Sequence, residues 1–342
     1  MEGQMLPYGT RELEAEIKRH PEDKHRLQCF VRGCTAWVRQ ARRGMPHVYC
    51  PDHGIRLHAS GNKPTHGYSS VHRNCIVARE EFCERIVYHP YKYDPSPERL
   101  ASENSEDMLS WNVFRSFAEA KLLAELIATL LGEQHAYEPD LYLWGIRVND
   151  GTFAGWHLLD RARQRFESHL PVNRPLTEPD IAIHLPGKYL VLIEAKFTSP
   201  NTYYSQGVRK NAQSLTCDEL RSIYQDPSHE ILDYERAARQ PRLFYQLWRN
   251  MTFAEWMSRC DHRETRAYHV NLVREGYEQE TAAEFATLIR GDYKDRFQQW
   301  TWEQLYRWLH RQPSMQRCAE YLETKTAYLR PAFQIKTQHV KT

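Results

Sequence analysis

The sequence predicts an α/β protein with a mixed sheet flanked by helices, an N-terminal metal-binding module and a helical C-terminal extension. Cysteine and histidine residues with metal-ligand spacing lie before residue 60, strand-like apolar runs lie between residues 142 and 273, and helical periodicity precedes and follows those runs. We therefore expect a module at 1–95, a linker at 96–104, a core at 105–275 and, at 276–342, an extension packed on the core.

Composition excludes several classes of protein. The chain has 342 residues, with 9 Trp, 20 Tyr and 12 Phe, which is too aromatic for a disordered protein. The apolar stretch Leu122–Leu131 is interrupted by Glu125 and is too short to span a membrane, and charged residues 1–20 do not resemble a signal peptide. The 8 cysteines are unevenly placed, which argues against a disulfide framework. We expect a cytoplasmic protein with no membrane partner.

Positive charge is concentrated near the N-terminus. Between Lys24 and Lys63 eight basic residues stand against the single acid Asp52, so this segment carries +7 and the rest of the chain −5, for a net charge of +2. Such a segment favours contact with phosphates, although a solvated loop explains the charge equally well.

Four residues in the basic segment have metal-ligand spacing: Cys29, Cys34, Cys50 and His53. Two short ligand pairs supply the tetrahedron that Zn²⁺ prefers, and four protein ligands leave no open position, so we expect a structural zinc. Buried free cysteines are the alternative interpretation. Spacing also leaves other ligands open, namely His25, His47, Cys75 and Cys83.

This arrangement resembles a zinc-ribbon or treble-clef finger. The resemblance places the first ligand pair on a knuckle, where Gly33 permits a tight turn, and the second at a helix start after Pro51. Arginines within the first pair and between the two pairs suit bidentate phosphate contacts, and we expect them to bind DNA. They are Arg32, Arg39, Arg42 and Arg43.

Periodicity predicts the remaining elements in chain order. We expect one helix capped by Ser105 and ended by Gly132, mostly helical structure at 235–259 and 281–328, and an aromatic helical core around Trp302. The aromatic set is Trp300, Trp302, Tyr306 and Trp308. The expected strands are Cys75–Ala78, Arg85–Tyr88, Tyr142–Val148, Ile181–Leu185, Tyr189–Phe197 and Ala267–Val273.

Two of these strands predict a hairpin that carries charge at one end. If the turn is centred on Gly187, Asp180 lies opposite Glu194 on the same face, and Lys196 follows on that face. Two adjacent carboxylates favour a divalent cation that binds a phosphodiester and activates water, with Lys196 offsetting charge on the phosphate. The alternative is a hairpin end neutralised by a salt bridge.

Pro179-Asp180 followed by Glu194-Ala195-Lys196 resembles the signature of the PD-(D/E)XK nuclease superfamily, over residues 105–275. The resemblance implies a restriction-endonuclease-like core in which Asp180 and Glu194 bind Mg²⁺ (or Mn²⁺) and Lys196 assists hydrolysis. The carbonyl of Ala195 is a further expected ligand. Many members carry another acid on the first helix, here Glu106 with Asp107 in reserve, although Glu106 equally suits the helix dipole.

We therefore expect a Mg²⁺-dependent endonuclease that cleaves DNA, and the resemblance implies restriction or phage defence. A catalytically inactive zinc-finger DNA-binding protein is the alternative. The resemblance leaves open a homodimer or partner proteins of a defence system. Tyr245 and Gln246, on the helix after Pro241, are of residue types that some superfamily members place near the site, but we interpret them as helix packing.

Overall fold

The computed structural model describes residues 26–60, 63–92, 96–170, 176–206, 215–226, 230–262 and 264–328. The chain forms two compact units. Unit 1 contains residues 1–89, 94–116 and 303–342, and unit 2 contains residues 90–93 and 117–302. The division at 95, 104 and 275 that we expect from the sequence stays a prediction. Among the described helices, none has both the length and the apolar character needed to cross a membrane.

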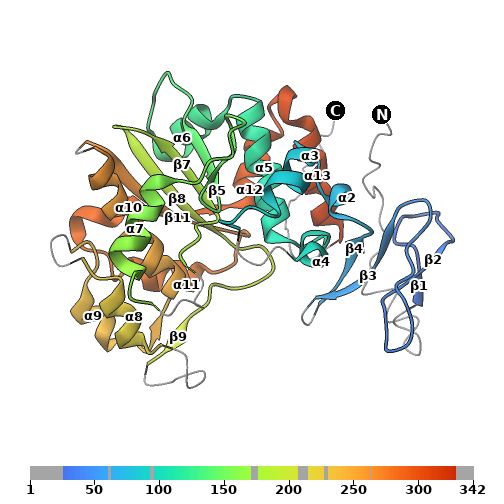
Figure 1. Ribbon diagram of the computed structural model, residues 1–342, viewed down its shortest axis with the longest axis horizontal. Helices are drawn as coiled ribbons and strands as arrows, with labels where there is room; N and C mark the ends of the chain where they lie inside the picture. The colour runs from blue at the N-terminus through green and yellow to red at the C-terminus, as the bar shows by residue number, and fades with distance from the viewer. Residues whose placement is uncertain are drawn as a thin grey trace. The chain divides into compact units, whose positions relative to one another are not determined.

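Unit 1 combines two small hairpins with helices (Figure 1). Its strands are β1 (Arg26–Gln28), β2 (Trp37–Arg39), β3 (Ile55–Ser60) and β4 (Lys63–Tyr68). Its helices are α2 (Val71–Asn74), α3 (Arg79–Glu81), the π-helix η2 (Phe82–Ile86), α4 (Pro97–Leu100), most of α5 (Glu106–Glu119), α12 (Trp302–Leu309, from Glu303), η4 (Pro313–Met315) and α13 (Gln316–Tyr328). Glu103 and Lys325 form a buried ion pair within this unit.

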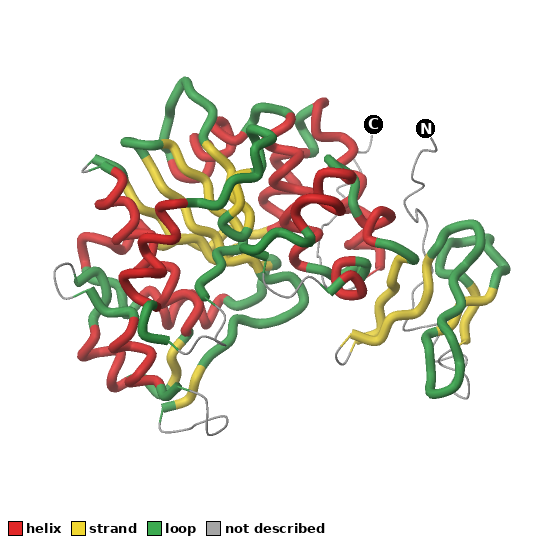
Figure 2. Tube along the Cα trace, in the orientation of Figure 1, coloured by secondary structure: helices red, strands yellow, loops and turns green. Residues whose placement is uncertain are grey.

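Unit 2 is built on a mixed six-stranded sheet, seen in yellow between helices in Figure 2. The strand order is β12-β11-β8-β7-β5-β6, in which β8, β11 and β12 are parallel and the other pairs are antiparallel. The strands are β5 (Asp140–Leu143), β6 (Ile146–Arg147), β7 (Ile181–Leu185), β8 (Tyr189–Ala195), β11 (Arg266–Val273) and β12 (Phe297–Thr301), with the separate pair β9 (Tyr204–Ser205) and β10 (Arg242–Leu243).

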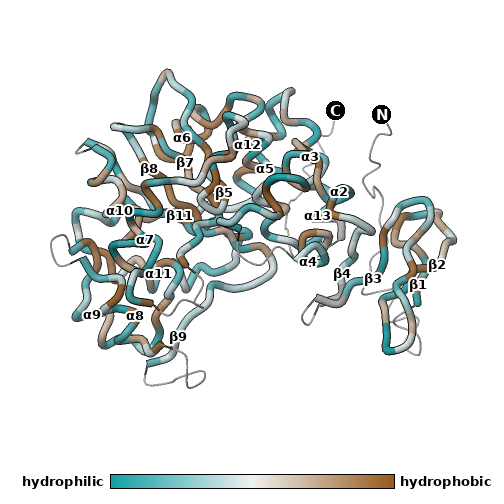
Figure 3. The backbone as a smooth tube through the Cα atoms, in the orientation of Figure 1, coloured by the Kyte–Doolittle hydropathy of each residue, from teal (hydrophilic) through white to brown (hydrophobic). Residues whose placement is uncertain are grey.

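Helices cover the sheet because its central strands are apolar on both faces. Every residue of β8 is buried, and Figure 3 shows that hydrophobic residues follow one another along β8 and β11. Helix α10 (Tyr245–Asp261) packs on β8 and β11, with α7 (His157–Glu167) beside it (Figure 1). The other helices are α6 (Leu123–Leu131), α8 (Cys217–Ile223), α9 (Tyr234–Arg239), α11 (Gln279–Ala286) and η3 (Gly291–Arg296).

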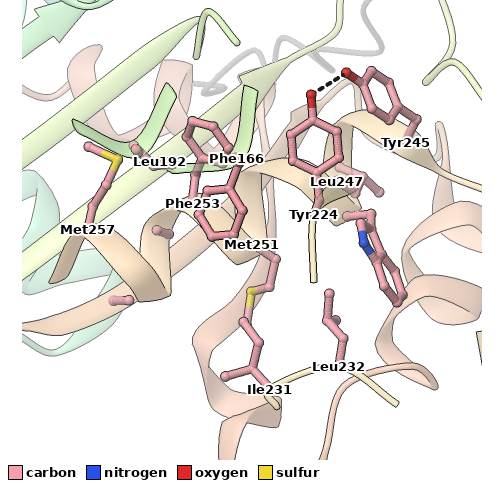
Figure 4. Close-up of a cluster of buried hydrophobic side chains, with 14 of the residues drawn as sticks. Phe166, Leu192, Tyr224, Ile231, Leu232, Tyr245, Leu247, Met251, Phe253 and Met257 are labelled. Atoms are coloured by element: carbon pink, nitrogen blue, oxygen red, sulfur yellow. Dashed lines mark hydrogen bonds between the residues drawn. The ribbon is translucent and has the colours of Figure 1, made fainter. Parts of the chain in front are cut away.

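The core beneath α10 is aromatic and aliphatic. Phe166, Phe253 and Met257 pack together with Leu192 of β8 (Figure 4). Complete burial of one such side chain stabilises the fold by roughly 1.5–3 kcal/mol. This packing fixes α10 against the sheet, and α10 carries polar side chains to the end of β8.

Several expected elements differ from the structure. Cys75–Ala78 is a loop and Arg85–Tyr88 falls in η2 and a turn, because a short apolar run does not distinguish strand from helix. The helix expected from Ser105 to Gly132 is two helices, separated at Lys121 by a positive φ of 56°. The Ser105 cap is confirmed, since its hydroxyl accepts the Met108 N–H at 3.3 Å.

One further expectation is wrong in part. Tyr142–Val148 is a hairpin rather than one strand, because Trp144 and Gly145 both have positive φ and turn the chain. The regions 235–259 and 281–328 are mostly helical, as expected, and each also contains one short strand. These strands are β10 in the first region and β12, which pairs in parallel with β11, in the second. The C-terminal aromatic side chains are buried, as expected of core residues: Trp300, Trp302, Tyr306 and Trp308.

Candidate functional site

The β7–β8 hairpin has the register predicted from the sequence. Leu185 pairs with Tyr189 and Ile181 with Ile193, so the pairing is symmetric about Gly187, whose φ is +71°. Continuing the register by one residue brings Asp180 opposite Glu194. The geometric argument for this hairpin is therefore confirmed.

Glu194 lies at the carboxyl end of β8 and is 1% exposed. Its Oε1 accepts a hydrogen bond from Lys196 Nζ at 2.7 Å and another from the Gln246 amide. Its Oε2 accepts one from Asn250 Nδ2 at 2.8 Å. Burial opposes ionisation, but the charges of Lys196 and Arg249 hold the pKa of Glu194 below its usual value. The structure thus stabilises a buried, ionised carboxylate.

Helix α10 supplies the two amides. Gln246 and Asn250 are four residues apart and so lie on one face of the helix, next to the end of β8. The interpretation of Gln246 as a packing residue is wrong, because its side chain binds Glu194. Asn250 was not predicted from the sequence, although the spacing of two amides on the helix that follows the hairpin was a signal for it.

Arg249 lies between these amides in the chain and is 9% exposed. Its guanidinium carbon is 5.0 Å from the centre of the Tyr245 ring. Burial alone would lower its pKa, but the nearby Tyr245, Tyr224, Glu194 and Glu167 raise it, so Arg249 stays charged. It adds a second cation to the surroundings of Glu194.

Asp180 is half-buried, and its side chain contacts the backbone at the end of β8, next to Glu194. Its Oδ2 accepts the N–H of Ala195 at 2.8 Å. The next N–H, of Lys196, donates to the Leu272 carbonyl at 2.8 Å, and the Lys196 carbonyl accepts the Trp302 indole N–H at 3.0 Å. The structure therefore brings Asp180, Glu194 and Lys196 together at one end of the hairpin.

A buried hydrogen-bond network fixes the segment that leads to Asp180. Glu167, at the end of α7 and 2% exposed, accepts the Thr177 N–H at 2.9 Å and the Thr177 hydroxyl. It also accepts the Tyr224 hydroxyl at 2.7 Å, and Tyr224 is hydrogen-bonded to Tyr245 at 3.0 Å (Figure 4). Thr177 is three residues before Asp180, so α7 anchors this segment. Glu167 was not predicted from the sequence, because nothing in its neighbouring residues marks a role for it.

Strand β11 extends the polar surroundings of Glu194. Asn271 is the register partner of Glu194, and its Oδ1 accepts the Asn201 amide at 3.1 Å. The same amide donates to Glu278 at 3.1 Å. Within the described chain, Asn271 Nδ2, Asn201 Oδ1 and Gln246 Oε1 are buried without a hydrogen-bond partner. Buried polar atoms of this kind normally have a hydrogen-bond partner, so these side chains are suited to binding a polar ligand.

His269, two residues earlier on β11, is a neutral neighbour. Its Nδ1 donates to the Leu192 carbonyl at 3.1 Å, and burial lowers its pKa to about 4. It is therefore uncharged near neutral pH and adds no third cation to the site.

The expected helix acid is in a different unit from the hairpin. Glu106 is the first residue of α5 and belongs to unit 1 with Asp107, whereas Asp180 and Glu194 belong to unit 2. Both acids lie in the first turn of α5, where their negative charge interacts favourably with the positive end of the helix dipole. A catalytic role for Glu106 stays a prediction.

The Cys/His cluster forms within unit 1. One ligand atom from each of Cys29, Cys34, Cys50 and His53 lies within 4.8 Å of the others. Cys50 Sγ is 3.3 Å from His53 Nδ1 and 3.7 Å from Cys34 Sγ. Burial raises the pKa of the Cys29 thiol and so disfavours the thiolate that binds a metal. A bound cation would overcome this effect by stabilising the thiolate. The four residues could hold a metal ion, as the spacing predicts.

Two tight turns present these ligands. The Cys34 N–H donates to the Val31 carbonyl at 3.2 Å, and Gly33 has a φ of +82°. The second pair lies in a turn closed by the Gly54 N–H and the Cys50 carbonyl at 2.8 Å. The expected helix start after Pro51 is wrong, because β3 begins directly after this turn.

The arginines predicted to contact DNA differ in exposure. Arg32, Arg42 and Arg43 are exposed. Arg39 is half-buried and its guanidinium donates to the Pro46 carbonyl at 3.4 Å. The exposed three are thus accessible to a polyanion.

Comparisons with known proteins give one finding. A family model described as Restriction Endonuclease associating with ARP matches residues 79–326, which is more than two thirds of the chain. No curated protein and no solved structure matches. The matched region contains the whole β7–β8 hairpin, α10 and β11. The chain therefore belongs to the family of restriction endonucleases associating with ARP.

Proposed function

We propose that this protein is a metal-dependent nuclease that hydrolyses DNA phosphodiester bonds in restriction, with Asp180, Glu194 and Lys196 as its catalytic residues. The observation that carries this proposal is Glu194, a buried carboxylate beside Asp180 that the charges of Lys196 and Arg249 keep ionised and that also accepts hydrogen bonds from two amides. A structural salt bridge needs only the ammonium. The family description supports a restriction endonuclease, and the hairpin supports the PD-(D/E)XK assignment.

The residues fit a hard divalent cation such as Mg²⁺ or Mn²⁺. Carboxylate oxygens of Asp180 and Glu194 and the Ala195 carbonyl are the ligand type that such cations prefer. A carboxylate has about four lone-pair positions, and the three donors to Glu194 leave one, on Oε2. A bound cation would supply an activated water and stabilise charge on the phosphate. Lys196 keeps Glu194 ionised and offsets charge that develops on the phosphate.

The Cys/His cluster has a structural role in this proposal. Cys29, Cys34, Cys50 and His53 hold Zn²⁺ with no position left for substrate. The exposed Arg32, Arg42 and Arg43 then bind phosphates of the DNA. The family description names ARP as an associated protein, and we extend the expectation of such a partner to this chain.

A cleavage assay tests the proposal. Purified protein is incubated with plasmid, linear duplex and single-stranded DNA in Mg²⁺, Mn²⁺ or EDTA. We expect cleavage that requires the divalent cation and that disappears in Asp180→Asn purified in the same way. Cleavage by Asp180→Asn at the wild-type rate would exclude the hairpin as the catalytic site.

A further inference from the structure

The hairpin β1–β2 in unit 1 has one buried and one outward face. Leu27 pairs with Val38, and both are 0% exposed. Because side chains alternate along a strand, their neighbours Arg26, Trp37 and Arg39 point to the opposite face. Trp37 is 46% exposed there, although an indole of this size gains from burial. The module buries Phe30 completely, so an apolar core exists that does not take up Trp37.

An arginine accompanies the exposed indole. The guanidinium carbon of Arg26 lies 5.1 Å from the centre of the Trp37 ring, within the range of a cation–π contact. This contact places a positive charge over a face of the ring. Trp37 is thus a partly solvent-exposed aromatic surface with a cation over its ring.

Charge around Trp37 identifies the ligand class. From Arg26 to Ser60 six arginines stand against one acid, Asp52, which gives a formal charge of +5. Arg56 is 4% exposed and donates to the Tyr49 hydroxyl at 3.1 Å, so it serves the fold. Of the other five, Arg26, Arg32, Arg42 and Arg43 are exposed, and they favour a polyanion over an apolar ligand.

We propose that Trp37 is a stacking platform for an unpaired base and that the module prefers DNA with exposed bases over intact duplex. Aromatic side chains interleaved with basic ones are how proteins bind single strands, since every base has a π face and every nucleotide a phosphate. A duplex keeps its bases stacked on one another and offers the arginines only its backbone. This inference rests on the proposed function for the choice of DNA as the nucleic acid.

The test measures binding without cleavage. The full-length Asp180→Asn protein is kept in buffer without Mg²⁺ and without a chelator, so that the module retains its zinc, and its zinc content is verified. It is titrated against three fluorescent DNAs: an oligothymidylate, a strand of equal length in which every nucleotide is abasic, and a duplex. The abasic strand keeps the phosphates and removes the bases. We expect the oligothymidylate to bind more tightly than the abasic strand. Adding Trp37→Ala weakens oligothymidylate binding about fivefold to a hundredfold.

Two variants separate stacking from loss of fold or charge. Trp37→Phe retains an aromatic face and most of the affinity, and Met45→Ala, which truncates another exposed apolar residue of the module, changes nothing. Trp37→Ala leaves binding to the abasic strand and the duplex within about twofold of the parent. Unchanged oligothymidylate binding by Trp37→Ala, or an equal loss for all three DNAs, overturns the inference. Because no cleavage is measured, base-dependent binding by a protein that never cuts DNA would support this inference while refuting the nuclease.

Discussion

Replacing Lys196 with Met tests whether the cation beside Glu194 serves catalysis. The substitution keeps the aliphatic stem and removes an ammonium 2.7 Å from Glu194 Oε1. The two residues are 7% and 1% exposed, so water cannot take the place of the ammonium. Breaking a buried ion pair costs about 3–5 kcal/mol, and since Gln246 and Asn250 still donate to Glu194, we expect the lower end of this range, about 3 kcal/mol near pH 7.

The pH dependence has a defined sign. In the wild type the folded-state pKa of Glu194 is lowered, so its stabilisation is present above the unfolded-state pKa and is lost as pH falls through the folded-state value. Without Lys196 the folded-state pKa of Glu194 rises, because only Arg249 and the two amide donors then oppose the effect of burial. The stability deficit of Lys196→Met is therefore largest near neutral pH and shrinks as pH falls toward 4.

Urea unfolding of metal-free protein at about pH 5 and about pH 8 measures this deficit. The matched control is Lys325→Met, which removes a buried lysine beside Glu103 in unit 1, where burial raises the pKa of Glu103 to about 7. Both variants lose stability, but only Lys196→Met loses Mg²⁺-dependent cleavage at a temperature where both remain folded. The reasoning is refuted by equal cleavage rates in the two variants, or by a Lys196→Met deficit that is the same at both pH values.

Four other changes have expected outcomes. Asp180→Asn should abolish the rise in Tm that Mg²⁺ causes, and a wild-type rise in a thermal-shift assay would remove Asp180 from the metal site. Cys50→Ser should lose bound zinc by elemental analysis, and full zinc occupancy would exclude Cys50 as a ligand. Arg42→Ala with Arg43→Ala should weaken binding to all DNA and reduce the salt slope by about one unit per lost phosphate contact, whereas an unchanged slope means that both arginines face solvent. Glu167→Ala leaves the buried Thr177 N–H and hydroxyl without their acceptor, so the free energy of unfolding should fall by about 2–3 kcal/mol and the cleavage rate should fall as well. Glu167→Gln, which keeps one oxygen, should restore both stability and cleavage, whereas wild-type cleavage by the folded Ala variant would contradict the anchoring role.

Features set by local geometry could be predicted from the sequence. The β7–β8 register follows from a short turn at Gly187 between two apolar runs, and the Cys/His cluster follows from ligand pairs on two turns. The strand β12 could not be predicted, because it lies at the edge of the sheet and only Trp300 is fully buried, so its sequence shows no apolar alternation. The break at Lys121 was also missed, since a positive φ at a lysine has no signature in the sequence.

The partners of Glu194 show where sequence reasoning stops and why. A carboxylate at the end of a strand buried on both faces requires donors, and this requirement follows from the amino-acid sequence alone. The donors Gln246 and Asn250 are 52 and 56 residues away, and only the packing of α10 on β8 selects them from the other amides of the chain. Glu167 is still less visible, because it acts through Thr177 and contacts none of the charged residues of the hairpin end in the described hydrogen bonds. The charged residues of such a site can thus be identified from the strand that carries them, whereas the residues that hold them ionised and in place depend on tertiary packing.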